Sequence, residues 1–222
     1  MNEASVANEV DLAVIGFGKG GKTLAATLGK QGWRVAMIEQ SAQMYGGTCI
    51  NIGCVPTKSM VYRAEHLGAG AVHPAEYLAA ITATGELTTG LRAVNYAMLD
   101  NLDTVDVITG TARFTGPNTI AVHTDGGEVT VQARWIIIGT GSRPTLPDIP
   151  GLAASPRTRT STDLLGQEQL PARLVVLGGG YVGLEFAAMA RAAARTREDL
   201  YEPSAMAVAT VDAEGVPNVR TV

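Results

Sequence analysis

Cys49 and Cys54 are the residues of this chain whose type and spacing point most directly to chemistry. They lie in the stretch GGTCINIGCVPTK, Gly46 to Lys58. A disulfide between them would close a small ring, which costs little chain entropy and can be reduced by a local movement. Cys54 lies just before Pro56, a residue type favoured at the first position of a helix, and a helix N-terminus stabilises a thiolate. The pattern indicates an exchangeable dithiol.

Two structural roles for these cysteines are weaker alternatives. A permanent disulfide is expected in secreted proteins, and the N-terminus MNEASVANEVD lacks the apolar segment of a signal peptide. A tetrahedral metal site would need two further ligands, and the three histidines, His66, His73 and His123, show no ligand spacing. We therefore expect no metal site, and we expect these histidines to be surface or packing residues.

The stretch GFGKGGKT fits two phosphate-binding loops. Gly16, Gly18 and Gly21 fit the dinucleotide fingerprint, while the same stretch ending in Lys22 and Thr23 fits the nucleoside-triphosphate loop. In a dinucleotide site the first glycine permits a tight turn, the second lets the backbone approach the pyrophosphate, and the third lets helix and strand pack closely. The triphosphate loop needs an acidic metal ligand at the end of a later strand, but the later strand WIII ends in Gly-Thr-Gly.

A second copy of the pattern favours the dinucleotide loop. LVVLGGGYVG repeats LAVIGFGKGG, so that Gly178, Gly180 and Gly183 match the first three glycines, and this copy has no lysine. Glu39 ends the strand after the first helix, where an acid bonds ribose hydroxyls in dinucleotide sites. Lys22 is then expected to be a solvated residue of the first helical turn.

The elements that position these residues alternate between strands and helices. DLAVIG, a helix over 22–32 and RVAMIEQ form a βαβ unit of the expected size. Helices are expected at about 56–68 and 74–103, and a Pro-rich connection is expected at RPTLPDIPG. The remaining expected strands are VDVITG, TARFTG, TIAVHT, EVTVQA and WIIIGTGS.

Composition excludes several other classes of protein. The 222 residues are 46% hydrophobic and 17% charged, which suits a folded α/β protein rather than a disordered chain. The net charge of -4 gives no electrostatic reason to expect nucleic acid as a partner. Apolar runs such as WIII are too short to span a membrane, so we expect no membrane association and a cytoplasmic location.

These motifs together resemble the class I pyridine nucleotide-disulfide oxidoreductases, which include dihydrolipoamide dehydrogenase, glutathione reductase and mercuric reductase. The resemblance rests on GGTCINIGCVPTK after a first glycine loop, followed by IIIGTGSRP and by GGGYVG with a nearby Glu, and it covers about residues 11–190. IGFGKGGKTLA, GWRVAMIEQS and MYGGTCINIGC look like the bacterial branch linked to reactive-chlorine resistance and copper(II) reduction.

The resemblance implies an α/β fold with a Rossmann-like FAD-binding domain over 1–150 and an incomplete second Rossmann unit, for NAD(P), over 151–195. The residues implied to bind FAD are Gly16, Gly18 and Gly21 at the pyrophosphate, Glu39 at the ribose, Gly47 and Thr48 at the flavin, Ala112 at the adenine end, and Thr140 and Gly141 closing over the cofactor. The residues implied to bind NAD(P)H are Gly178, Gly180, Gly183 and Glu185.

The resemblance also implies a route for electrons. Hydride passes from NAD(P)H to FAD, and electrons then reach the disulfide through Cys54, the thiolate next to the flavin. Cys49 is the interchange thiol that faces the acceptor, which is a disulfide, a metal ion or a small oxidised molecule. Lys58 is implied to lie near flavin N5, where its charge stabilises the reduced flavin.

The chain also departs from the family pattern. After the helix EFAAMARA we expect no second strand and no acid or Arg that would choose between NADH and NADPH. Within these 222 residues we do not expect the later FAD-contacting segment or the dimerisation domain of the homodimeric family, with its His-Pro…Glu base. The tail 196–222 is expected to be a β-hairpin that turns at DAEG and resembles the start of pyridoxamine 5′-phosphate oxidase, although Arg220 is not expected to be a site. The alternative function is a catalytically incomplete flavin-binding fragment, or a fusion.

Overall fold

The computed structural model describes residues 8–66, 74–169, 171, 173–194, 207–211 and 217–221. These residues belong to two compact units. The first unit combines Met1–Gly53 with Thr88–Arg143, and the second combines Cys54–Leu87 with Pro144–Val222. The domain boundaries expected after residues 150 and 195 stay predictions.

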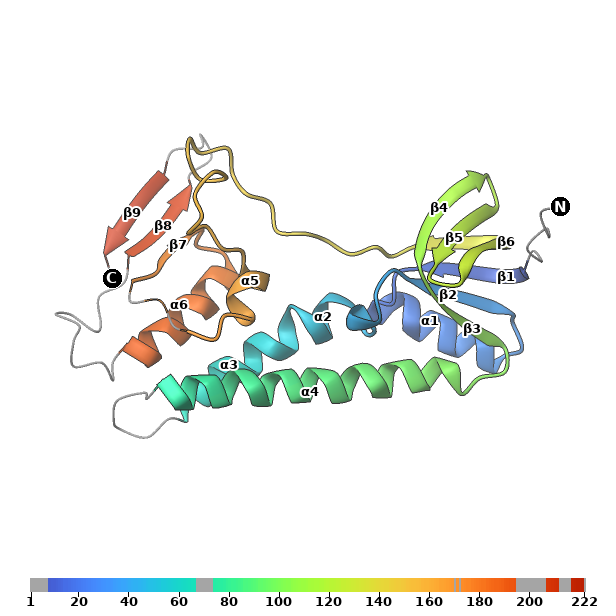
Figure 1. Cartoon of the computed structure of the whole chain (residues 1–222), viewed down its shortest axis with the longest axis horizontal. Helices are drawn as coiled ribbons and strands as arrows, with labels where there is room; N and C mark the ends of the chain where they lie inside the picture. The colour runs from blue at the N-terminus through green and yellow to red at the C-terminus, as the bar shows by residue number, and fades with distance from the viewer. Residues whose placement is uncertain are drawn as a thin grey trace. The chain divides into compact units, whose positions relative to one another are not determined.

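The first unit is built on one six-stranded sheet with the order β3-β2-β1-β6-β5-β4 (Figure 1). β1, β2, β3 and β6 pair in parallel, while β4 and β5 join them as an antiparallel meander. The carboxyl ends of β1 and β2 therefore meet at one edge, where open α/β sheets bind ligands. The strands are β1 (Asn8–Ile15), β2 (Val35–Glu39), β3 (Val105–Thr109), β4 (Thr111–Gly116), β5 (Thr119–Thr124) and β6 (Gly127–Ile138).

The core of this unit lies on both faces of the sheet because its central strands carry apolar residues on both sides. Leu12 and Val14 of β1 pack in one cluster with Ala25 and Ala26 of the helix α1. Ala13, which points to the other face, packs in a second cluster with residues of β5 and β6. All five residues of β2 are buried, as expected for a parallel strand covered on both sides.

β6 differs from the expectation drawn from the sequence. EVTVQA and WIIIGTGS were expected to be two strands, but residues 127–138 form one continuous strand. Its first half pairs antiparallel with β5, and from Val131 onward it pairs in parallel with β1. The junction at Ala133 and Arg134 contains no turn-forming residue, so the backbone continues the ladder from one partner to the other.

The helices begin and end close to the predicted positions. α1 (Lys19–Lys30) starts three residues earlier than expected, and α3 (Cys54–Glu65) starts at Cys54 itself, so that Pro56 lies inside its first turn. Proline is tolerated in a first turn because its missing N–H would have no partner there. The long helix α4 spans Pro74–Asp100. The 3-10 turn η1 (Ala42–Met44) and the short helices α2 (Gly47–Asn51) and α5 (Ser161–Leu165) were not expected.

The second unit contains α3, α5, α6 (Tyr181–Ala194) and a small sheet with the order β7-β8-β9. β8 (Ala207–Val211) and β9 (Pro217–Thr221) pair antiparallel, which confirms the expected hairpin strands. β8 also pairs in parallel with β7 (Val175–Leu177), which differs from the expectation that no second strand follows the helix. The resemblance of this tail to pyridoxamine 5′-phosphate oxidase stays a prediction.

A small apolar core joins α3 to α6 within this unit. Met60 of α3 packs with Phe186 and Met189 of α6, and Tyr77 completes the buried cluster. This packing fixes the two helices side by side (Figure 1). None of the helices in the described ranges has both the length and the apolar character that a membrane crossing requires.

Candidate functional site

The first glycine loop has the geometry of a pyrophosphate cradle. Gly16 has φ +107°, and a Cβ there would lie 2.1 Å from the carbonyl oxygen of Gly139. A Cβ on Gly21 would lie 2.6 Å from Cγ1 of Val14, so helix and strand can approach closely only without it. At Gly18 a Cβ would meet no atom within 4 Å, so the space beside it is open to a ligand. Each glycine thus meets the requirement that a dinucleotide fold places on it.

The second glycine loop repeats this geometry in the second unit. Gly178 has φ +108°, close to the value of its counterpart. A Cβ on Gly183 would lie 2.3 Å from the carbonyl oxygen of Gly178 and 3.3 Å from Cγ1 of Val176, while the space beside Gly180 is open. The repeat seen in the sequence is therefore a repeat of backbone conformation, which favours two dinucleotide sites over a single glycine-rich turn.

Glu39 lies where an acid would reach a ribose. It ends β2 and is 8% exposed, and its Oε2 accepts a hydrogen bond of 2.9 Å from the backbone N–H of Phe17, next to the first loop. Its backbone carbonyl accepts a 2.9 Å bond from the N–H of Gly110, two residues before the half-buried Ala112 of β4. The bond from Phe17 holds the carboxylate of Glu39 beside the first loop, and both donors are neutral backbone N–H groups.

The segment that carries Cys49 packs directly on the first loop. Gly47 has φ +72°, and a Cβ there would lie 2.6 Å from Cα of Gly18. Thr48 follows, and its Oγ1 lies 3.3 Å from the Cβ position of Gly141, which has φ +76°. Thr140 belongs to the same loop after β6. The structure therefore brings together six residues proposed for one site: Gly16, Gly18, Gly47, Thr48, Thr140 and Gly141.

The two cysteines lie on separate short elements of the chain. Cys49 is half-buried within α2 and belongs to the first unit. Cys54 is exposed at the first residue of α3 and belongs to the second unit. The position of Cys54 at a helix N-terminus is the one expected from the sequence, since backbone N–H groups there stabilise a thiolate.

Lys58 and Glu185 form an ion pair within the second unit. Lys58 lies one turn after Cys54 on α3, and Glu185 lies on α6 just after Gly183. The lysine side chain is 66% exposed and the glutamate 26%. This contact joins Lys58, proposed for FAD, to Glu185, proposed for NAD(P)H. The charge of Lys58 is therefore held in place by a residue of α6.

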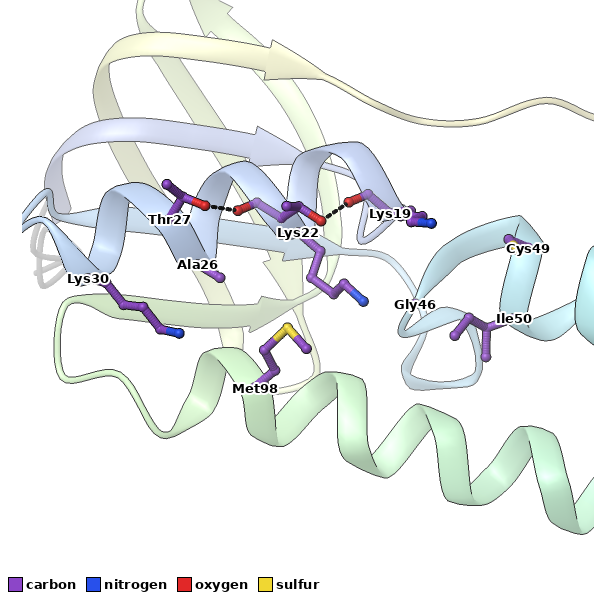
Figure 2. Close-up of a pocket in the computed structure, with 10 residues that line it drawn as sticks. Lys19, Lys22, Ala26, Thr27, Lys30, Gly46, Cys49, Ile50 and Met98 are labelled. Carbon is purple, nitrogen blue, oxygen red and sulfur yellow. Dashed lines mark hydrogen bonds between the residues drawn. The ribbon is translucent and has the colours of Figure 1, made fainter.

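A cavity of about 440 Å³ opens beside Cys49 in the first unit (Figure 2). It lies between α1, the Gly46–Ile50 segment and the C-terminal half of α4. Lysines 19, 22 and 30 line it together with Cys49, Ile50 and Met98. Cavities of this size hold small organic ligands, and Cys49 is the nucleophilic side chain at this one.

Lys22 corrects an expectation from the sequence. It was expected to be solvated, but it is 8% exposed and donates a hydrogen bond to Oδ1 of Asn95 on α4. The reason is visible in the helical spacing, because positions 22, 25, 26 and 29 form the buried face of α1. Burial lowers the pKa of Lys22 from its ordinary value, Lys19 lowers it further, and Cys49 acts in the opposite direction.

Two of the three histidines, His66 and His123, lie in the described ranges. His66 is exposed and stacked on Tyr62, and His123 is exposed on β5, as expected for surface residues. His73 lies outside the described residues. Within those residues, no group of three or more His, Cys, Asp and Glu side chains is arranged to hold a metal ion.

A family model described as pyridine nucleotide-disulphide oxidoreductase matches residues 10–214 of this chain. Among curated proteins, the chain is 44% identical over 182 residues to the probable pyridine nucleotide-disulfide oxidoreductase RclA of Escherichia coli, covering 82% of this chain and 40% of that protein. It is 40% identical over 187 residues to a mercuric reductase of Streptomyces lividans, covering 79% of this chain and 39% of that protein.

The solved structures give the same result. A Cu(II) complex of the HOCl-induced flavoprotein disulfide reductase RclA from Escherichia coli matches with a TM-score of 0.79 and 40% identity, covering 93% of this chain and 43% of that one. The chain therefore spans about two fifths of the length of these relatives.

Proposed function

Because the chain belongs to the pyridine nucleotide-disulphide oxidoreductase family, we propose that it carries the flavin and dithiol centre of an NAD(P)H-dependent oxidoreductase. The family uses FAD and NAD(P)H. The observation that carries the proposal is the packing of Gly47 on Gly18, because it sets the cysteine segment against the open face of the first glycine loop.

The residues of the first unit fit FAD in chemistry and in space. Gly18 leaves room for a pyrophosphate, and the N-terminus of α1 presents backbone N–H groups to its negative charge. Glu39 would accept the hydroxyls of the adenosine ribose, and Ala112, close along the chain to the Glu39–Gly110 contact, would allow the adenine end to approach. Thr48, Thr140 and Gly141 would close over the cofactor.

The cysteines would act as the electron relay. When bound, FAD supplies two-electron redox chemistry between NAD(P)H and the dithiol. Cys54, at the N-terminus of α3, would be the flavin-side thiol. Cys49, which lines the cavity, would exchange with the acceptor.

Lys58 would place a positive charge next to the flavin-side thiol, and Glu185 would hold that charge in position. Gly178, Gly180 and Gly183 would bind NAD(P)H, and Glu185 would also contact this nucleotide. We further propose a cytoplasmic location and a homodimeric parent enzyme. A disulfide, a metal ion or another small oxidised molecule would serve as acceptor.

The test is to purify the full chain, load it with FAD and add NAD(P)H without oxygen. We expect a bound flavin absorption band and, after reduction, two reactive thiols. Cys49→Ser should keep a long-wavelength thiolate–flavin absorption that Cys54→Ser loses. A folded, colourless protein that takes up no flavin would refute the proposal. A protein that binds FAD but oxidises no NAD(P)H would support the alternative of a catalytically incomplete fragment.

A further inference from the structure

Tyr45 joins three parts of the first unit that lie far apart in the sequence. It follows η1 and comes two residues before α2 begins. Its ring packs on Phe17 of the first glycine loop, with 5.0 Å between the ring centroids, and on Tyr96 of α4, with 4.9 Å. Its hydroxyl shares a 2.6 Å hydrogen bond with the hydroxyl of Thr109, which ends β3. One half-buried side chain therefore contacts the first loop, the long helix and the sheet.

Two of these contact residues are also neighbours of Glu39, the residue proposed for the adenosine ribose. The backbone N–H of Phe17 donates a 2.9 Å hydrogen bond to Oε2 of Glu39. Thr109 is the partner of Glu39 in the ladder between β2 and β3, and the N–H of Gly110 donates to the carbonyl of Glu39. Through Phe17 and Thr109, Tyr45 is thus linked to Glu39 from both the loop and the sheet.

The backbone of Tyr45 belongs to the segment that carries Cys49 (Figure 2). The carbonyl oxygen of Tyr45 accepts a 3.0 Å hydrogen bond from Nδ2 of Asn51, and the same amide donates a 2.9 Å bond to the carbonyl of Gly47. Gly46 and Gly47 have φ +92° and +72°. Glycine loses more conformational freedom on folding than any other residue, so contacts at both ends of the segment are needed to select this conformation. Tyr45 supplies them at one end and Asn51 at the other.

The hydrogen bond to Thr109 contributes to geometry more than to stability. It is exposed, so water can replace the partner of either hydroxyl at little net cost. A phenylalanine at position 45 would make the same ring contacts with Phe17 and Tyr96. The hydroxyl is therefore the part of Tyr45 that fixes the ring against the end of β3.

Resting on the proposed function, we propose that Tyr45 is a positioning residue that couples the nucleotide end of the FAD site to the segment that carries Cys49. A nucleotide bound beside Glu39 holds Phe17 and Thr109 in place, and Tyr45 passes this constraint along its backbone to the cysteine segment. Such coupling is reciprocal, so loss of the Tyr45 hydroxyl also weakens binding of the nucleotide.

The experiment uses the full chain without flavin or nicotinamide, and the probe is ADP, the nucleotide half of FAD. Hydrogen exchange measures the protection of the backbone amides of residues 46–51 with and without saturating ADP. We expect ADP to slow this exchange at least about fivefold in the unmodified chain, the lower end of typical couplings. Tyr45→Phe and Thr109→Val each remove one hydroxyl of the pair, and the slowing should be lost in both. Each variant should raise the Kd for ADP about two- to tenfold, as loss of a neutral hydrogen bond does, and the double variant should raise it no further.

Tyr62→Phe is the matched control, because it removes an exposed tyrosine hydroxyl on α3 in the second unit, and it should keep both the Kd and the protection of the unmodified chain. If Tyr45→Phe does not fold, Thr109→Val decides, since Thr109 is exposed. Variants that bind ADP and keep the full slowing of exchange overturn the coupling but leave the proposed function intact. An unmodified chain that binds no ADP refutes the nucleotide site itself, and the coupling with it.

Discussion

Gly18→Ala should weaken FAD binding while leaving the fold intact. Gly18 is the N-cap of α1 with φ -72° and ψ 167°, an extended conformation that any residue adopts. The added methyl group would meet no protein atom within 4 Å. Restricting the unfolded chain gains about 0.4–1 kcal/mol, and alanine at an N-cap loses a similar amount. The free energy of unfolding should therefore change by no more than about 0.5 kcal/mol.

The same methyl group would occupy the space through which a pyrophosphate approaches the backbone. Displacing the phosphate costs at least one hydrogen bond from a backbone N–H to a charged oxygen, which is about 1.5–3 kcal/mol. That loss corresponds to an increase of about 10- to 150-fold in the Kd for FAD. The variant thus separates binding from stability at one position of the loop.

Two measurements check this prediction. Urea unfolding of the flavin-free protein gives the stability, and quenching of flavin fluorescence gives the Kd. Gly90→Ala is the matched control, since its Cβ also meets nothing within 4 Å but lies on α4, and it should bind FAD normally. Gly16→Ala should unfold, because its Cβ would overlap the carbonyl of Gly139. A folded Gly18→Ala protein with an unchanged Kd would refute the assignment of this loop.

Three further predictions concern charge. Glu185→Gln should change stability by less than about 1 kcal/mol, because its partner Lys58 is largely exposed, yet it should slow reduction of the loaded protein by NAD(P)H in stopped-flow measurements. The pKa of Lys22 is lowered in the folded state, so between that lowered pKa and 10.5 the unfolded state binds more protons than the folded state. The free energy of unfolding should therefore rise with pH in this window, and urea titrations of Lys22→Met should lack the rise. The backbone N–H and hydroxyl of Thr160 lower the pKa of Asp163 below 3.8, so its stabilisation of α5 should be complete above pH 3.8 and lost as pH falls through the lowered pKa, which NMR titration of the carboxyl group can follow.

Local pattern predicted the first βαβ unit well because its strands and helix carry their own signals. β2 is buried over its whole length and apolar up to Glu39, and α1 has the small residues Ala25 and Ala26 on its inner face. The strand after β5 was predicted less well, since the change of partner inside β6 depends on pairing with the distant β1. Sequence patterns describe one chain segment at a time and do not contain that pairing.

The candidate site shows the same limit. The glycines and cysteines could be proposed from the sequence because each proposed role requires a particular residue type. Lys22 was missed because a lysine in a first helical turn is usually solvated, and its burial depends on Asn95 of α4, far along the chain. The contact between Lys58 and Glu185 also arises from packing of α3 on α6, which neither helix predicts by itself.

The two glycine loops and the two cysteines are related in a way that the separate motifs do not show. Within the first unit, the helix of Cys49 begins at Gly47, which packs on the first loop at Gly18. Within the second unit, the helix that begins at Cys54 is paired through Lys58 to the helix of the second loop. Each cysteine is thus linked to a different glycine loop, and four residues separate the two cysteines in the chain. In the proposed function, the Cys-x4-Cys dithiol would open and close while Cys49 keeps its support from the first loop and Cys54 keeps its support from α6.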